Sequence, residues 1–301
     1  MAAARRRQLL DDEFLATLNT LDLSTRMPIN NRFAGVHRSK TYGGISEFAD
    51  YREYQPGDDL RRIDWNLAGR TGQYYIKQFL DEKKQQVRIF LDTSLSMLGE
   101  ADSDKSLAAL RMGAAIAYLA VQAMDSVCFY AMNGAKSVPV GPVINCKSQL
   151  IASFAELEQV GFYGTCDIGA AIADQARYGG GRGLTVILSD LQTDSDWKGA
   201  IRSLKAKGQD VLLICLLSKG EERPSYRGAQ SLADAEIPEA QPFSVEVDRD
   251  MLHAYGEAVQ WFYRDLEAFC AGENVALACV RGGDKPEEVL LRQGFMTGLI
   301  K

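Results

Sequence analysis

The feature that most constrains the fold is a regular alternation, beyond residue 85, of short apolar runs with longer segments of helical periodicity. Val87–Leu91 and Leu184–Leu188 are rich in branched residues, which favour buried strands. Between such runs lie segments like 104–124, in which apolar residues recur on one stripe of a helix. Strands that alternate with helices are typical of a parallel sheet covered on both faces. We therefore expect residues 85–301 to form an α/β fold, a three-layer sandwich whose mostly parallel sheet has about five or six strands.

The last third of this region carries weaker signals. Residues 219–242 are rich in Glu, Pro, Ser and Ala, and we expect a loop or arm there. Phe243–Val247 is predicted to be an edge strand and Met251–Ala271 a helix. Val275–Val280 is predicted to be the final core strand.

Residues 1–84 do not follow this alternation, and we assign them to an N-terminal extension. Asp11–Leu21 is predicted to be a helix, whereas 26–72 is rich in Gly, Arg and Asp and has little periodicity. The alternating residues of Tyr74–Phe79 predict a strand that pairs beside Val87–Leu91.

The composition indicates a globular protein of a reducing compartment. With 46% hydrophobic and 25% charged residues the chain can bury a sizeable core, and a net charge of −6 argues against a non-specific nucleic-acid binder. Six cysteines without a CxxC pair and two distant histidines argue against a disulfide framework and an imidazole zinc site. No apolar signal-like run precedes Asp11, and Leu107–Met124 contains Arg111, which suits a buried helix better than a membrane span. We expect a cytoplasmic protein without a membrane span.

The chemistry-bearing motif is Asp92-Thr93-Ser94-Leu95-Ser96, which directly follows the predicted strand Val87–Leu91. An acidic residue and hydroxyls therefore emerge at the carboxyl end of a strand, the edge at which open α/β sheets bind ligands. A carboxylate combined with neutral hydroxyl oxygens suits a hard cation, Mg²⁺ or Mn²⁺. The alternative is a loop whose Ser and Thr only cap the next helix.

Two later segments add to this motif. Ser189-Asp190 follows the predicted strand Leu184–Leu188, so Asp190 also lies at a carboxyl strand end. Thr165 precedes a predicted helix that begins at Ile168, where its hydroxyl can face the same crevice. The resulting set of candidate ligands suits an octahedral cation that keeps several waters, and comprises Asp92, Ser94, Ser96, Thr165 and Asp190.

This set resembles the metal-ion-dependent adhesion site of von Willebrand factor A domains. The resemblance implies that Ser94 and Ser96 bind the cation directly, that Asp92 and Asp190 act mostly through water, and that one coordination position is free for a partner's acidic side chain. The sequence departs from the family pattern at the threonine, because alignment of the following helix puts Cys166 rather than Thr165 in that position. Cys is a poor ligand for a hard cation. Either Thr165 moves into place, which we favour, or the site is weakened or empty.

A longer resemblance lies upstream. Glu47–Asp59, Arg62-Ile63-Asp64-Trp65 and Ala68-Gly69-Arg70 resemble the signature of the bacterial DUF58 family, whose members pair it with a von Willebrand A-like domain. Many members carry two N-terminal membrane helices, and this chain resembles the short, soluble branch without them. The charged and aromatic residues of the signature are Asp58, Asp59, Arg62, Asp64, Trp65 and Arg70. They form either a paired structural network, with Trp65 as an anchor onto the sheet, or a partner-docking surface.

The function that this resemblance implies is a non-enzymatic, cation-dependent protein-binding module. Family members resemble components that assist MoxR-type AAA+ ATPases in assembling or activating other protein complexes. The chain has no Walker A pattern, so ATP hydrolysis would belong to the partner. Two alternatives are a scaffold with a degenerate metal site that binds through residues 26–72, and a metal-dependent phosphohydrolase built on Asp92.

Overall fold

A computed structural model of the protein describes residues 9–19, 47–55, 58, 60, 63–80, 85–98, 105–175, 182–234, 236–237, 241–281, 284–285, 288–290 and 292. The chain forms two compact units. One unit comprises Met1–Ile29 together with Gln85–Lys301, and the other comprises Asn30–Lys84. The short helix α1 (Asp12–Leu18), which the sequence analysis assigned to the N-terminal extension, therefore belongs to the larger unit.

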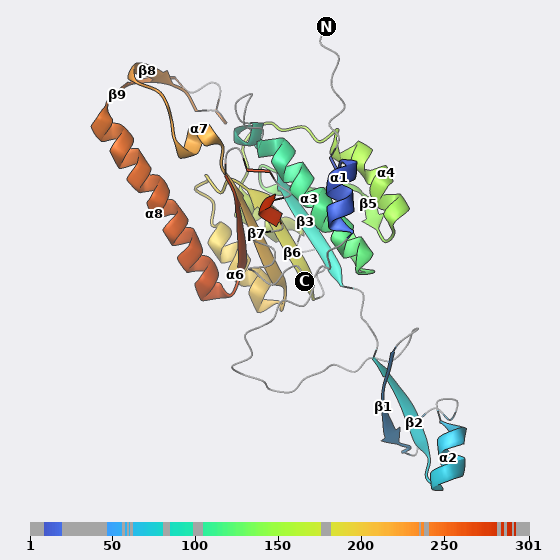
Figure 1. Cartoon of the computed structure of the whole chain (residues 1–301). Helices are drawn as coiled ribbons and strands as arrows, with labels where there is room; N and C mark the ends of the chain where they lie inside the picture. Colours follow the sequence, from blue (N-terminus) through green and yellow to red (C-terminus); the bar gives the residue numbers. More distant parts are fainter. Residues whose placement is uncertain are drawn as a thin grey trace. The chain divides into compact units, whose positions relative to one another are not determined.

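The larger unit is built on a six-stranded sheet with the order β10-β7-β6-β3-β4-β5. All neighbouring strands in it are parallel except the last pair, β4 and β5. This architecture confirms the predicted α/β fold with a mostly parallel central sheet (Figure 1). The strands are β3 (Gln86–Asp92), β4 (Ser126–Asn133), β5 (Lys136–Ile144), β6 (Gly183–Ser189), β7 (Asp210–Leu216) and β10 (Ala276–Val280).

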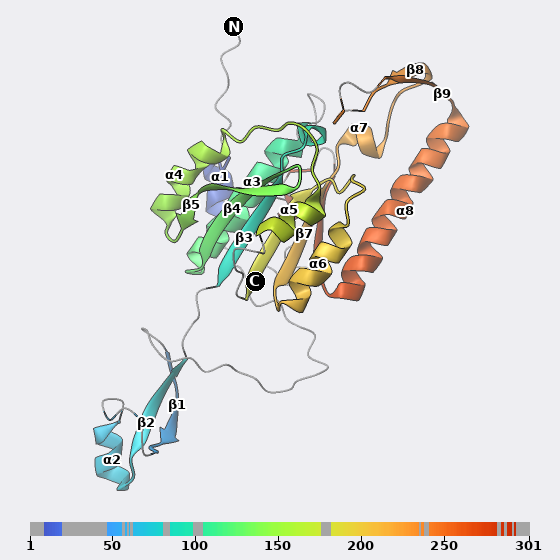
Figure 2. The same ribbon diagram turned by 180° about the vertical axis from the view of Figure 1, so that it is seen from behind.

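Helices cover both faces of this sheet, as Figures 1 and 2 show from opposite sides. On one face, α3 (Lys105–Gln122) lies in a core cluster with residues of α1 and of α4 (Lys147–Leu157). The other face carries α5 (Ile168–Gln175), α6 (Trp197–Ala206) and the long helix α8 (Arg249–Glu273). Because both faces are covered, β3 and β6 are buried along nearly their whole length, as expected of central parallel strands.

Strand β5 was missing from the sequence prediction. Its sequence contains Pro139, Gly141 and Pro142, which read as strand breakers. Proline has no backbone N–H, so it is tolerated mainly on edge strands, and β5 is the outermost strand beside β4. The sheet therefore reaches six strands through β5.

The predicted loop 219–242 contains regular structure. A short helix α7 (Lys219–Glu222) is followed by β8 (Gly228–Leu232), which pairs antiparallel with β9 (Phe243–Val247). The predicted strand 243–247 thus exists, but it belongs to this separate hairpin and not to the edge of the main sheet. The hairpin precedes α8, whose first residues follow the N-cap Asp248.

The smaller unit contains a hairpin of β1 (Glu47–Glu53) and β2 (Tyr75–Leu80), with α2 (Trp65–Thr71) between them. The predicted strand Tyr74–Phe79 is therefore present, but its partner is β1, which the irregular composition of 26–72 concealed. The prediction that it pairs beside Val87–Leu91 was wrong, since the neighbours of β3 are β4 and β6. Among the helices described, none combines the length and apolarity needed to cross a bilayer.

Candidate metal centre

Two neighbouring strands bring the acidic motifs together. β3 and β6 run parallel with Leu91 opposite Leu188, so Asp92 and Ser189 end their strands at the same level. Neighbouring strands lie about 4.8 Å apart, which keeps the following residues within side-chain reach. The 3-10 turn η2 (Leu95–Leu98) then carries the end of the DxSxS motif along this edge.

The Asp92 carboxylate is the centre of a buried hydrogen-bond cluster. Its Oδ1 accepts hydrogen bonds from the Ser94 backbone N–H at 2.9 Å and from the Ser94 hydroxyl at 2.7 Å. Its Oδ2 accepts a hydrogen bond from the Ser189 hydroxyl at 2.6 Å. The Ser94 and Ser96 hydroxyl oxygens lie 3.1 Å apart. The hydroxyls of Ser94 and Ser96 therefore lie together on the side of this carboxylate.

Burial makes the ionised form of the Asp92 carboxyl unfavourable. Asp92 is 2% exposed and Asp190 is also 2% exposed. Burial raises the pKa of Asp92, hydrogen bonds from Ser189 and Ser94 oppose that shift, and the charge of Asp190 adds to it. Two carboxylates buried close together favour a positive charge between or beside them.

Part of that positive charge comes from Lys105, which the sequence analysis did not identify. Lys105 is 3% exposed, and its Nζ donates hydrogen bonds to Asp190 Oδ2 at 2.9 Å and to Glu221 Oε1. Burial alone would lower the pKa of Lys105, but the carboxylates of Asp190 and Glu221 raise it above its ordinary value. The sequence holds no local signal for this residue, because its two partners lie 85 and 116 positions away.

The loop that carries Thr165 is tied to the DxSxS loop by main-chain hydrogen bonds. Leu95 N–H donates to the Gly164 carbonyl at 2.9 Å, and Tyr163 N–H donates to the Thr93 carbonyl at 2.8 Å. Gly164 has a φ of 66°, in the left-handed region that favours glycine. The third predicted loop thus reaches the same edge of the sheet.

Within that loop, Cys166 and not Thr165 lies against Asp92. Thr165 is exposed and lines the outer cleft, whereas Cys166 is 5% exposed. Burial raises the pKa of the Cys166 thiol well above its usual range, and the charge of Asp92 and a hydrogen bond with it raise it further. A protonated thiol is a poor ligand for a hard cation. Thr165 can therefore contribute an oxygen only from the rim, and its role as a ligand stays a prediction.

A polar cleft of about 940 Å³ opens onto these residues. Its lining includes Ser96, Thr165, Cys166, Glu221 and Glu236. Burial raises the pKa of Glu236, hydrogen bonds with Ser96 and Ser94 oppose that rise, and the charges of Asp92 and Asp190 add to it. One of the chain's own carboxylates thus approaches the serine hydroxyls from the cleft side.

The donor set fits a hard divalent cation. Lys105 pairs with Asp190 and Glu221, while Glu236 lies in the field of Asp92 and Asp190. The serine hydroxyls and the Asp92 carboxylate supply hard oxygens. Among the residues described, no group of three or more His, Cys, Asp and Glu side chains is arranged to hold a metal, so a cation here depends on the hydroxyls.

The signature residues of the smaller unit divide into two kinds. Asp58 pairs with Arg52 at 2.7 Å, and Asp64 caps α2 by accepting hydrogen bonds from the backbone N–H groups of Asn66 and Leu67. Asp64 also accepts a hydrogen bond from the Tyr51 hydroxyl at 2.9 Å. These contacts agree with the structural interpretation of the two aspartates.

Trp65 and Arg70 are different, because both are exposed within this unit. Trp65 is 63% exposed and meets Tyr74 edge to face, while Arg70 lies in the last turn of α2. The interpretation of Trp65 and Arg70 as partner-binding residues remains a prediction. Asp59 and Arg62 lie outside the described residues.

The chain is similar to several known proteins. Uncharacterized proteins of Mycobacterium tuberculosis and Mycobacterium bovis are each 28% identical over 239 residues, covering 78% of this chain and 75% of the relative. The protein BatB from Bacteroides thetaiotaomicron is similar in structure, with 17% identity, a TM-score of 0.44, and coverage of 71% of this chain and 98% of BatB. A von Willebrand factor type A protein from Catenulispora acidiphila has 12% identity and a TM-score of 0.38, and the match covers 74% of this chain and 43% of that protein. Residues 50–260 match the family model described as protein of unknown function DUF58, and since this match spans more than half of the chain, the protein belongs to the DUF58 family.

Proposed function

We propose that this protein is a non-enzymatic protein-binding module that uses a divalent cation, Mg²⁺ or Mn²⁺, to engage an acidic residue of a partner. The observation that carries the proposal is the cluster of buried Asp92 and Ser94 with half-buried Ser96, beside Asp190 and open to the cleft. A cation held mainly by neutral hydroxyls remains electron-poor and attracts a further carboxylate. Ser94 and Ser96 would hold the cation directly, with Asp92 and Asp190 in support.

The environment of Asp92 favours binding over catalysis. A phosphohydrolase of the aspartyl-phosphate type needs a carboxylate oxygen that can attack a substrate. Both oxygens of Asp92 already accept hydrogen bonds, and the residue is buried. Turnover of a generic phosphate ester that disappears in Asp92→Asn would favour the enzyme instead.

The position of Glu236 supports an acidic ligand. Its carboxyl hydrogen-bonds with Ser96 and Ser94 and lies in the field of Asp92 and Asp190. Glu236 thus places a carboxyl group beside the serine hydroxyls on the side of the cleft. In the proposed complex a partner carboxylate would approach by the same route and displace Glu236.

The partner that family resemblance suggests is a MoxR-type AAA+ ATPase together with its client proteins. The test is a pulldown with the tagged full chain, in buffer with Mg²⁺ and in buffer with EDTA. We expect an AAA+ ATPase to be retained, and retention to fall on chelation and in Ser94→Ala/Ser96→Ala. Retention that neither change affects would refute cation-dependent capture.

A second candidate is a scaffold whose metal site has degenerated, and two observations favour it. Cys166 occupies the place beside Asp92 where a hydroxyl ligand is expected, and Lys105 already supplies positive charge to Asp190. Such a scaffold would bind partners through residues 26–72, where Trp65 is exposed. It predicts that Trp65→Ala abolishes capture whereas Ser94→Ala/Ser96→Ala leaves it unchanged.

A further inference from the structure

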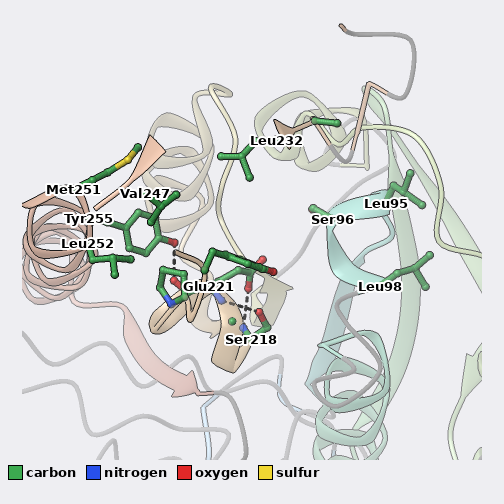
Figure 3. Close-up of a pocket in the computed structure, with 14 residues that line it drawn as sticks. Leu95, Ser96, Leu98, Ser218, Glu221, Leu232, Val247, Met251, Leu252 and Tyr255 are labelled. Carbon is green, nitrogen blue, oxygen red and sulfur yellow. Dashed lines mark hydrogen bonds between the residues drawn. The ribbon is translucent and has the colours of Figure 1, made fainter. Parts of the chain in front are cut away.

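An apolar groove lies next to the candidate metal centre. It has a volume of about 620 Å³ and is enclosed by η2, α7, the β8–β9 hairpin and the first turns of α8. Figure 3 shows Leu98 and Ser96 on one side and Met251, Leu252 and Tyr255 on the other, with Ser218 and Glu221 between them. A concave site of this size can enclose one or two large side chains.

The lining of this groove is more exposed than a core would be. Leu98, Met251 and Tyr255 are each 40% exposed, and Leu232 on the hairpin is 36% exposed. These apolar residues come from separate elements, yet all of them line the one groove. Clustered exposed apolar side chains mark interaction sites, whereas apolar residues scattered singly over a surface do not.

The floor of the groove is held in place before any ligand binds. Ser218 and Glu221 form a capping box at the start of α7, with hydrogen bonds of 3.1 Å and 2.7 Å. The Tyr255 hydroxyl donates to the Glu221 backbone carbonyl at 2.6 Å, and the Glu221 side chain pairs with Lys105. A preformed wall lowers the entropy lost on binding.

The groove and the polar cleft are continuous. Ser96 and Glu221 line both of them, and Leu95, which lies between the two motif serines in sequence, lines the groove. A ligand whose carboxylate lies at Ser96 therefore has its neighbouring side chains at the mouth of the groove. Among the described residues that line the groove, the one charged side chain is Glu221, which pairs with Lys105, so the groove favours an uncharged apolar group.

We propose that the groove binds a bulky apolar side chain adjacent to the partner's acidic residue, so that the partner is recognised by an Asp or Glu next to Leu, Ile, Met or Phe. This inference rests on the proposed function, because the cation site supplies the acidic half of the motif. The groove supplies selectivity among acidic segments, since a metal–carboxylate contact alone does not distinguish them.

The experiment uses a random peptide library displayed on phage and selected on the immobilised full chain in millimolar Mg²⁺. We expect enrichment of peptides that carry an acidic residue beside a bulky apolar one. A selected peptide is then synthesised and its affinity measured by fluorescence polarisation with Mg²⁺ and with EDTA, for the wild type, Met251→Asp and Ser94→Ala/Ser96→Ala.

Met251→Asp introduces a charge into the groove while preserving the helix, because an acidic residue in the first turn of α8 is favourable. The matched control is Ile151→Asp on α4, an apolar residue that is 66% exposed and lies outside the groove. We expect Met251→Asp to weaken the peptide by about tenfold or more, and the control to leave its affinity unchanged.

The outcomes separate the two proposals. Peptides that need an acidic residue and Mg²⁺, but show no apolar preference and no response to Met251→Asp, would refute the proposed role of the groove. They would remain consistent with the proposed cation site. Peptides that bind through the groove equally well in EDTA and in Ser94→Ala/Ser96→Ala would overturn the combined motif together with the cation-dependent function. A dimer in solution that Met251→Asp converts to a monomer would assign the groove to a second copy of the chain, and would also overturn the proposal.

Discussion

Replacing Lys105 by Met tests the electrostatics of the candidate metal centre. The side chains of Lys105 and Asp190 are 2% and 3% exposed, whereas that of Glu221 is 28% exposed. Without the lysine, Glu221 can turn toward water, but Asp190 is left as a buried charge beside Asp92. Breaking a buried pair by removing one partner costs about 3–5 kcal/mol.

This loss is measurable as a change in melting temperature. Each kcal/mol shifts the midpoint by about 2–4 °C in a domain of this size class, so Lys105→Met should melt about 6–20 °C lower than the wild type in EDTA. Circular dichroism melts at neutral pH supply the measurement. The control is Lys198→Met, which breaks a partly exposed pair with Asp265 whose side chains are 32% and 41% exposed. The control should lose about 1 kcal/mol or less.

Added cation should restore part of the loss, because a divalent ion supplies the positive charge that Asp190 lacks in the variant. A cation at one hundred times its dissociation constant stabilises the folded state by about 2.7 kcal/mol. Equal melting temperatures for Lys105→Met and Lys198→Met would show that the buried carboxylates do not need the lysine. The charge argument for a cation would then lose its basis.

Three further predictions concern single residues of the site. Burial raises the pKa of Asp92 above 3.8, so the folded state binds the carboxyl proton more tightly than the unfolded state does. The protonated Asp92 therefore contributes fully to stability below about pH 3.8, and this contribution is lost as pH rises through the folded pKa. As pH rises, the denaturant midpoint measured in EDTA should therefore fall less for Asp92→Asn than for the wild type. Parallel plots of midpoint against pH for the two proteins would contradict this. Cys166→Thr should tighten Mg²⁺ binding in calorimetry, whereas Cys166→Ala should not, since only threonine adds a hard oxygen. Glu236→Ala should strengthen capture of an acidic partner severalfold by removing the internal competitor, and weaker capture would show that Glu236 belongs to the docking surface.

The parts of the site that follow from regular structure could be predicted from the sequence. Val87–Leu91 and Leu184–Leu188 read as buried strands, and parallel strands end at one edge, so the meeting of Asp92 with Ser189 and Asp190 followed from the fold. The hydroxyls of Ser94 and Ser96 belong to the same DxSxS motif as Asp92, so their position near its carboxylate could also be predicted.

Other parts depend on contacts between distant segments and could not be predicted. The ion pairs of Lys105 join the start of α3 to the loop after β6 and to α7, and no local pattern encodes them. The two prolines of β5 read as breakers, although an edge strand tolerates them. Choosing between Thr165 and Cys166 required the register of the loop, which its hydrogen bonds to Thr93 and Leu95 determine.

The central claim is that the hydroxyls of Ser94 and Ser96, with the carboxylate of Asp92, hold a divalent cation. Calorimetric titration of millimolar Mg²⁺ and Mn²⁺ into the full chain tests it most directly, with Ser94→Ala/Ser96→Ala as the comparison. We predict a saturable heat and a rise in melting temperature for the wild type, and neither for the double variant. An absence of both in the wild type, or an equal response in the two proteins, would contradict the claim.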